Sequence, residues 1–425
     1  MKKIPFLIIY TFCALFILLD HVNAQTFRQR IDSAINAGNA KNYEEVIFQL
    51  DQALKIDSTS ANVYRSRGLA KSYLNMHEFA IIDYNKAIAL KTNDTSSYYY
   101  RAVSEFSIGD HKNAITDLDI AIKLDPVSAE YYNRRGSAYG ILEQYIAALS
   151  DFSKAVILEP DSSRYYADKA LVEIRLKQFK EAIEDCNVAL KLDPKSSDAL
   201  LNRGMAKNDM GEFANAIPDY EEALKISPRL PVLYFNKAIS ELNIARPVDA
   251  IADCDKAISL DKMYVDAYQL RAYLNYRSSK FRESVTDLSE VLEIDSKNVK
   301  AYNDRALSYL SLKDFKSSLQ DYSNVILLNP KDYNAFGNRG YAKSKLGDYL
   351  GAIADYNQSL NIFPMSASTY NYRGYAYLML KQYKKALTDY DDALKIGGPN
   401  FKPDLHYRND AIKALSAKTN KSNHK

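Results

Sequence analysis

The chain has 425 residues, a formal net charge of +3 and 26% charged residues, a balance that does not indicate a dedicated binder of nucleic acid or another polyanion. Its length exceeds that of one ordinary globular core, so several domains or an array of repeats are expected. With only 14 Gly and 12 Pro, the sequence favours long regular elements joined by short, similar turns.

Residues 1–24 have the pattern of a bacterial secretory signal peptide. Two lysines open the chain, an apolar run extends from Ile4 to Leu19, and Val22-Asn23-Ala24 resembles a small-residue cleavage site. The alternative is an N-terminal membrane anchor, for which the apolar run is short. We therefore expect cleavage, export to the periplasm or cell envelope or release from the cell, and a mature chain that does not span a membrane.

A 34-residue period fills the chain from residue 27 to about residue 400. It is followed most easily at a Gly or Ala that recurs without insertion or deletion, at Ala34, Gly68, Ala102, Gly136, Ala170, Gly204, Ala238, Ala272, Ala306, Gly340 and Gly374. The eleven repeats start at residues 27, 61, 95, 129, 163, 197, 231, 265, 299, 333 and 367. They are numbered 1 to 11 below, and the positions within each repeat are numbered from 1 to 34.

Each repeat has the pattern of two amphipathic helices joined by a short turn. Positions 4, 8 and 11 form one helical stripe, as in Tyr132, Gly136 and Tyr139, and positions 20, 24 and 27 form another. Small residues on both stripes allow the two helices to approach closely. Pairs such as Asp125-Pro126 end the second helix. One repeat cannot bury its own apolar faces, so a continuous core of stacked repeats is expected.

This pattern resembles the tetratricopeptide-repeat (TPR) family, whose signature has small residues at positions 8, 20 and 27, aromatic residues at 11 and 24, and Pro at 32. Residues 133–139 show the motif, while Ser359 departs from it at position 27. The resemblance implies an all-α, right-handed superhelical solenoid of about eleven helix–turn–helix repeats over residues 27–400. A capping helix is expected over residues 401–417, with Leu405, Ile412 and Leu415 on its apolar side, followed by a disordered tail at 418–425.

No motif in the sequence indicates catalysis. A phosphate-binding Gly-rich loop and metal-ligand spacings are absent from the sequence, and no segment outside the repeats could hold a catalytic domain. Cys186 and Cys254 fall on apolar helical positions and are expected to be buried thiols. We therefore expect a protein that is not an enzyme and has no catalytic residues, cofactor, metal or nucleic-acid partner.

Two charged positions recur along the array. Position 7 is basic and position 23 is Asp in ten repeats, from Arg67 and Asp83 to Arg373 and Asp389. A charged binding ladder is one interpretation. We favour the other, in which the two positions pair between helices and fix their register.

In TPR proteins, positions 2, 5, 9, 12 and 13 of the first helix face the concave surface, and the resemblance places a partner there. These positions are rich in apolar side chains in repeats 5 to 9, which predicts a groove for an extended peptide or a helix of a partner protein. The candidate partner-binding residues are Leu171, Ile174, Asn202, Met205, Phe235, Asn236, Ile239, Leu242, Tyr273, Tyr276, Leu307 and Leu310.

Asn202 and Asn236 occupy position 6, where an Asn ladder grips peptide backbone in one TPR glycosyltransferase; the alternative is ordinary polar helix surface. In the second helix of repeat 6, Pro218 predicts a local bend.

The leading functional hypothesis is a protein–protein interaction scaffold of the cell envelope. The alternative is a module that binds cell-wall glycan or peptidoglycan fragments, because Tyr is abundant and repeats 8 and 11 place Tyr beside Gln269 and Asn371. The sequence leaves the identity of the partner and self-association open.

Overall fold

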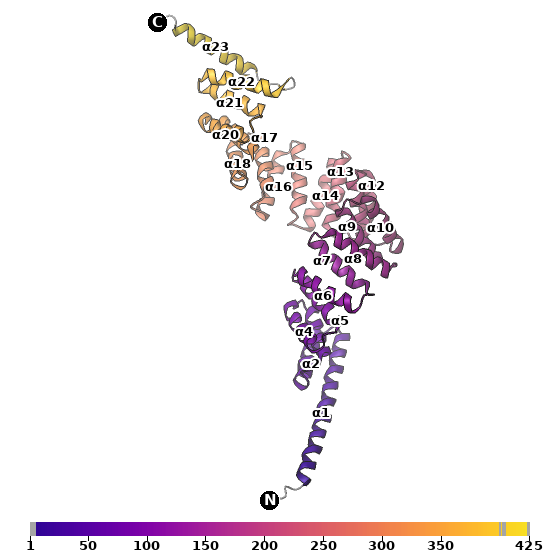
Figure 1. Cartoon of the computed structure of the whole chain (residues 1–425). Coiled ribbons are helices and arrows are strands. Elements are labelled where there is room, and N and C mark those ends of the chain that lie inside the picture. Colours follow the sequence, from indigo (N-terminus) through magenta and orange to yellow (C-terminus); the bar gives the residue numbers. More distant parts are fainter. Residues whose placement is uncertain (1–5, 399–400, 402–404, 423–425) are drawn as a thin grey trace. The chain divides into compact units, whose positions relative to one another are not determined.

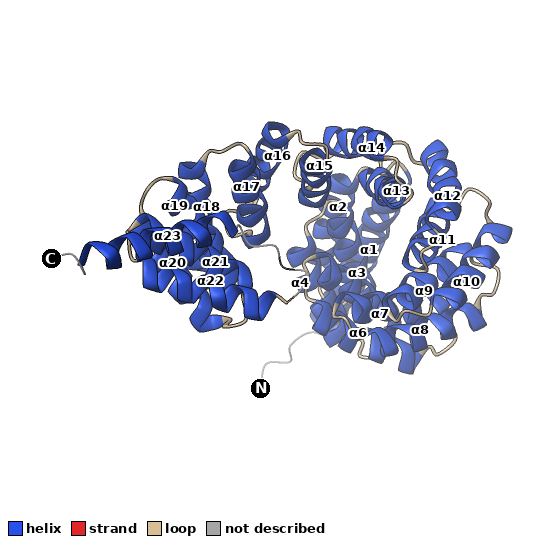
Figure 2. Cartoon of the chain, turned by 90° about the horizontal axis from the view of Figure 1, so that it is seen from above, coloured by secondary structure: helices blue, strands red, loops and turns tan. Residues whose placement is uncertain are grey.

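The computed structural model describes residues 6–398, 401 and 405–422, with side chains for residues 22–398, 401 and 406–416. Over this part of the chain all regular structure is helical, with 23 helices and no strand (Figure 1, Figure 2). The chain divides into two compact bodies, Met1–Ser227 and Pro228–Lys425, which we name the N-terminal body and the C-terminal body. No described helix is both long enough and apolar enough to cross a membrane.

Eleven helix pairs follow one another, one pair for each repeat. The first helices are α1 (Phe6–Asn39), α3 (Ala61–Tyr73), α5 (Thr95–Ser107), α7 (Ala129–Ile141), α9 (Ser163–Arg175), α11 (Ser197–Asp209), α13 (Pro231–Asn243), α15 (Val265–Arg277), α17 (Val299–Ser311), α19 (Tyr333–Lys345) and α21 (Ala367–Met379). The second helices are α2 (Tyr43–Ile56), α4 (His77–Leu90), α6 (His111–Leu124), α8 (Tyr145–Leu158), α10 (Phe179–Leu192), α12 (Phe213–Ile226), α14 (Pro247–Leu260), α16 (Phe281–Ile294), α18 (Phe315–Leu328), α20 (Tyr349–Ile362) and α22 (Tyr383–Gly397). Each first helix after α1 begins at position 1 of its repeat. The expectation of an all-α array of helix–turn–helix repeats is confirmed.

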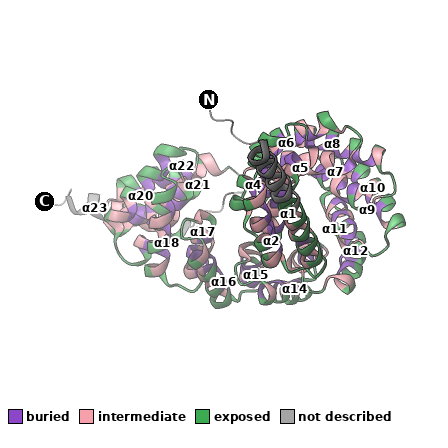
Figure 3. Cartoon of the chain, turned by 90° about the horizontal axis from the view of Figure 1, so that it is seen from below, coloured by how far each residue is buried: buried purple, intermediate pink, exposed green. Residues whose placement is uncertain are grey.

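The close approach of the two helices depends on positions 8 and 24 of the same repeat. Gly68 lies against Tyr84, and a Cβ added to Gly68 would be 2.8 Å from the ring. Five repeats place Gly at position 8, and all five have Tyr or Phe at position 24. Where position 24 is Leu or Cys, position 8 is Ala, as in the buried pair Ala102 and Leu118. Repeat 9 departs from this rule with Ala306 and Tyr322. The buried residues, purple in Figure 3, lie mainly where helices face one another.

The turn between the two helices has a constant backbone. Position 15 has a positive φ in every repeat, and it is Gly only at Gly109, Gly211 and Gly347. The other eight repeats place a residue with a side chain there, at Lys41, Asn75, Glu143, Lys177, Ala245, Ser279, Lys313 and Lys381. The next residue is the N-cap of the second helix, and in four repeats its side chain caps that helix, as where Asp348 accepts a hydrogen bond from the backbone N–H of Gly351 at 2.8 Å.

All ten predicted charge pairs between positions 7 and 23 are formed within their repeats. Arg135, for example, donates two hydrogen bonds to the buried carboxylate of Asp151, at 2.8 and 2.7 Å. Its third nitrogen, Nη1, reaches Asp119 at position 25 of the preceding repeat, at 2.5 Å. Each Arg at position 7 therefore joins three helices, and the interpretation as structural ion pairs is confirmed.

The C-terminal helix α23 (Leu405–Ser422) packs on repeat 11 through Tyr407 and Ala411, which contact the buried residues Ala386 and Tyr390. The expectation for Ile412 is wrong, because the packed face is one residue away and Ile412 is 39% exposed. Leu405 lies among the residues whose side chains are not described. The helix also continues to Ser422, past the expected end at residue 417.

Two single-residue expectations concern helix interiors. Cys186 and Cys254 are free and completely buried, as expected, and burial raises the pKa of each thiol to about 12. Pro218 lies inside α12, which runs without interruption from Phe213 to Ile226. The predicted bend at Pro218 stays a prediction.

Candidate functional site

The residues expected to line the groove over repeats 5 to 9 belong partly to the N-terminal body and partly to the C-terminal body. In the N-terminal body, Leu171 is 38% exposed and Met205 is half-buried. Ile174 and Asn202 are only 4% and 5% exposed. These two residues are therefore not available to a partner, and their assignment to the groove is wrong.

The burial of Ile174 and Asn202 has a physical reason. Ile174 packs with Ala170, Cys186 and Ala206, where repeats 5 and 6 meet. Asn202 donates from Nδ2 to the carbonyl oxygen of Ala167 at 2.9 Å, which satisfies both groups inside the interface of the two repeats. Positions 6 and 12 here serve the contact between neighbouring first helices, and Asn202 does not form a peptide-gripping rung.

In the C-terminal body, repeat 7 contributes mainly to packing. The ring of Phe235 lies 5.2 Å from that of Tyr264, and Leu242 packs on a core cluster that includes Ala238 and Leu274. Asn236 donates from Nδ2 to the carbonyl oxygen of Val232 in its own helix at 2.8 Å. The side chains of Phe235, Asn236, Ile239 and Leu242 are all half-buried.

Three predicted residues come together in the next two repeats. Tyr273, Tyr276 and Leu307 line a pocket of about 210 Å³, which we name the α15–α17 pocket. Its other lining residues are Ala272, Arg277, Ser284, Leu288 and Asp304. Tyr273 is 45% exposed, while Leu288 is buried beneath it, so the pocket combines an open aromatic wall with an apolar floor. Leu310, the last predicted residue, is half-buried against the adjacent core cluster.

Polar and charged side chains also line this pocket. Arg277 donates from Nη1 to the Tyr273 hydroxyl at 3.0 Å, and its guanidinium lies 5.9 Å from the centre of that ring. The ring of Tyr276 meets Phe281 edge-on at 5.4 Å. Asp304 accepts one hydrogen bond from Asn303 Nδ2 at 3.2 Å, and burial raises the pKa of this carboxyl group above its usual value.

An equivalent hollow, the α7–α9 pocket, occurs in the N-terminal body. It has a volume of about 520 Å³ and is lined by Ser137, Gly140, Asp168, Leu171 and Arg175, among others. Asp168 and Asp304 both occupy position 6 of their repeats. The α7–α9 pocket is wider because Ser and Gly stand at positions 9 and 12, where the α15–α17 pocket has two tyrosines.

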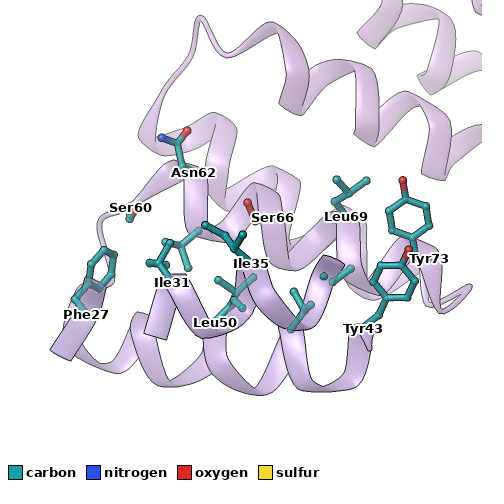
Figure 4. A pocket seen from close by; sticks show the side chains of 15 residues that line it. Phe27, Ile31, Ile35, Tyr43, Leu50, Ser60, Asn62, Ser66, Leu69 and Tyr73 are labelled. Carbon is teal, nitrogen blue, oxygen red and sulfur yellow. The ribbon is translucent and has the colours of Figure 1, made fainter. Parts of the chain in front are cut away.

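The largest of these hollows was not predicted. It lies between α1, α2 and α3, has a volume of about 600 Å³, and is named the α1–α3 pocket. Figure 4 shows Phe27 at one end and Tyr43 and Tyr73 at the other. These tyrosines stack with their ring centres 4.6 Å apart, and Ile31 lies on the apolar wall between the two ends. Position 12 of repeat 1 is Gly38. Since the α7–α9 pocket also has Gly at position 12, that glycine was the signal in the sequence.

Three buried glutamates have perturbed protonation without lying in any of these pockets. Glu105, Glu173 and Glu241 occupy position 11 in repeats 3, 5 and 7, and burial raises the pKa of each to about 7. Each is close to the basic residue at position 7, at 3.8, 3.1 and 3.0 Å respectively. They therefore belong to the ion-pair system between helices. Among the described residues no group of three or more His, Cys, Asp or Glu could hold a metal ion.

Family models described as tetratricopeptide repeats match residues 141–197, 197–230, 299–332, 333–364 and 367–398. These matches agree with the 34-residue register and with the helix pairs described above. The chain is a multi-TPR protein. Proteins of this family are generally interaction scaffolds without enzymatic activity.

Several solved structures resemble the chain. A tetratricopeptide repeat protein from Parabacteroides merdae is 18% identical with a TM-score of 0.41, covering 59% of this chain and 98% of its own. YrrB, described as a TPR protein with an unusual peptide-binding site, is 23% identical with a TM-score of 0.35, covering 43% and 95%. Yeast Tom70 is 16% identical with a TM-score of 0.36, covering 94% and 97%. These low values do not indicate a function. No curated protein matches the sequence.

Proposed function

We propose that this protein is a non-enzymatic interaction scaffold of the cell envelope, and that its first helices bind a peptide or a helix of a partner protein. The main support for this proposal is the α15–α17 pocket. Tyr273 presents an exposed ring above the buried Leu288, and Leu307 adds an apolar wall from the next repeat. Aromatic side chains beside an apolar hollow are typical anchors of protein interfaces.

The N-terminal sequence supports the envelope location. Cleavage after Ala24 would leave Gln25 and Thr26 ahead of repeat 1 and would not remove any residue of the array. The first helix of repeat 1 would then run from Phe27 to Asn39, which matches the 13 residues of the other first helices. Export would therefore be compatible with an intact solenoid.

The glycan alternative receives less support in repeat 8. A sugar-binding site needs free carboxamide or carboxylate groups beside its aromatic ring. Gln269 instead donates to Asn298 Oδ1 at 3.3 Å and accepts a hydrogen bond from Lys300 at 3.4 Å. Both the nitrogen and the oxygen of its amide are thus engaged within the protein. We therefore favour a peptide ligand over a glycan, and the test below distinguishes the two.

The test is photo-cross-linking in cells from a photoreactive residue at position 273, followed by mass spectrometry. The matched control carries the same residue at Lys313, which is exposed in the turn of repeat 9. A discrete protein adduct formed only from position 273 is the expected result, and it would identify the partner. Glycan adducts from position 273, or the same adducts from both positions, would contradict the proposal.

A further inference from the structure

Asp304 is the one acidic group that lines the α15–α17 pocket. Its side chain is half-buried and accepts one hydrogen bond, from Asn303, while no described residue forms an ion pair with it. Lys300, one turn earlier on α17, donates to Gln269 instead. Lys300 attracts Asp304 only at longer range. A partly buried carboxylate without an ion pair is unfavourable, and a cation that enters the pocket would relieve this cost.

Asp168, the equivalent residue in the α7–α9 pocket, has an ion pair that Asp304 lacks. Asp168 forms an ion pair with Arg164 at 3.6 Å and accepts a hydrogen bond from Asn133 at 3.1 Å. Both partners come from the protein itself. Asp304 occupies the same position of its repeat. Lys300 stands where repeat 5 has Arg164, but it attracts the Asp304 carboxylate without forming an ion pair, so this charge is less fully compensated than that of Asp168.

The walls of the α15–α17 pocket suit a long basic side chain. Leu288 and Leu307 offer apolar contacts to an aliphatic stem, as lysine and arginine stems find in many proteins. The rings of Tyr273 and Tyr276, both on α15, line the pocket as well, and aromatic faces attract cations. A carboxylate, two tyrosines and an apolar floor together match an amphipathic cation.

Arg277 opposes such a guest, because it brings a positive charge to the rim. Its side chain is exposed and is held on the Tyr273 hydroxyl, whereas Asp304 is partly removed from water. A charge acts more strongly where the surroundings are less polar, so we expect the carboxylate of Asp304 to outweigh the guanidinium of Arg277 for a bound guest. Asp304 and Arg277 favour guests of opposite charge, so substitution of each residue in turn shows which charge the pocket prefers.

We infer that the α15–α17 pocket accepts a lysine or arginine side chain of the partner peptide. This inference rests on the proposed function, since it names the chemistry of the segment that the same pocket would bind. The partner is thereby expected to present a basic residue flanked by apolar residues.

The experiment uses the full mature chain and three fluorescent peptides that differ only at the central residue, which is Lys, norleucine or Glu within an apolar frame. Binding is measured by fluorescence anisotropy at low salt. We expect the Lys peptide to bind about tenfold more tightly than the norleucine peptide, and the Glu peptide to bind most weakly. Asp304→Asn should abolish the preference for Lys. Glu293→Gln, the same loss of charge on the exposed surface of α16, should leave it unchanged.

Arg277→Gln provides an independent readout from an exposed rim residue and does not depend on the folding of the Asp304 variant. It should raise the affinity for the Lys peptide by about two- to threefold. A preference for the Glu peptide, or a Lys preference that survives in Asp304→Asn, would overturn the inference.

A different outcome is that the three peptides bind equally well and that Tyr273→Ala abolishes this binding. It would overturn the preference for a basic residue but support a peptide-binding pocket. If none of the peptides binds, this inference fails, and the cross-linking from position 273 decides separately on the scaffold.

Discussion

The α-carbon of Gly204 lies against the ring of Tyr220, and a Cβ added to Gly204 would be 2.6 Å from the ring carbon Cε1. Tyr220 is completely buried between α11 and α12, so its ring cannot swing into solvent. We expect Gly204→Ala to lower the free energy of unfolding by about 1–3 kcal/mol through overpacking. Urea unfolding followed by circular dichroism would measure this loss.

Two further variants separate overpacking from other effects of the substitution. Gly204→Ala combined with Tyr220→Leu should recover most of the stability, because Ala102 and Leu118 form this combination in repeat 3. In contrast, Gly140→Ala should stabilise α7 by up to about 1 kcal/mol, since nothing lies within 4 Å of its added Cβ. A neutral Gly204→Ala would mean that the two helices shift apart easily.

The turn of repeat 7 offers a stabilising substitution. Ala245 has a φ of +61°, a conformation that costs a residue with a Cβ about 1–2 kcal/mol. Since Gly has a larger loss of chain entropy on folding, we expect Ala245→Gly to raise the free energy of unfolding by about 0.5–1 kcal/mol. The opposite change at a turn that already has glycine, Gly211→Ala, should destabilise the protein. Thermal unfolding of both variants would check the two signs.

Removal of Arg135 tests the ion pairs between helices. Arg135→Met leaves the carboxylate of Asp151, which is 5% exposed, without its cation. We expect a loss of about 2–4 kcal/mol in the free energy of unfolding, because an uncompensated buried charge is costly. Arg135→Met combined with Asp151→Leu should recover most of this loss. If the double variant is as unstable as the single variant, the loss comes from the net stabilisation that the ion pair provides and not from an unpaired carboxylate.

Glu105 predicts a pH dependence of stability. Burial raises its folded-state pKa from 4.5 to about 7, so the folded state binds this proton more tightly than the unfolded state. Its contribution to stability is complete below about pH 4.5 and is lost as the pH rises through 7. Because Gln cannot ionise, Glu105→Gln should match the parent protein at pH 4 and be about 1–3 kcal/mol more stable at pH 8.

Urea titrations at the two pH values measure the effect of Glu105→Gln. The matched control is Glu184→Gln, which removes the same charge from the exposed surface of α10. An equal gain in both variants at pH 8 would point to net charge rather than burial as the cause.

The N-terminus of the exported protein is a further prediction. Expression of the whole chain in a bacterium, followed by intact-mass analysis of the envelope fraction, should give a species that begins at Gln25. Replacement of Ala24 by a bulky residue should leave the leader attached. A protein that retains residue 1 and stays in the cytoplasm would contradict the predicted export.

Much of the fold could be predicted because the repeat has a fixed length. The recurring Gly or Ala at position 8 placed the start of every first helix after α1, and the spacing of Arg135 and Asp151 placed their heads on facing helices. The residues of the candidate site could be predicted less completely from the sequence. Positions 6 and 12 point toward both the groove and the next repeat, and only the size of the neighbouring side chains decides between them, as for Ile174 and Asn202.

The hollows depend on absent side chains rather than on present ones. Gly38 and Gly140 leave space at position 12, whereas Tyr276 narrows the corresponding pocket. Because a glycine has no side chain that indicates a function, such positions are not recognisable as part of a pocket from the sequence alone. The packed face of α23 could not be predicted for a similar reason: the small Ala411 packs against repeat 11, while the larger Ile412 is exposed.

The left-handed residue in each turn has a consequence for the whole array. In seven of the eleven turns this residue is neither Gly nor Asn, the two types that adopt the conformation readily. At about 1 kcal/mol for each turn, the summed cost is comparable to the 5–15 kcal/mol that separates a typical folded domain from its unfolded chain. The protein could therefore be made more stable one turn at a time, by placing Gly at these seven positions. Such substitutions would alter no helix and no surface that a partner would contact.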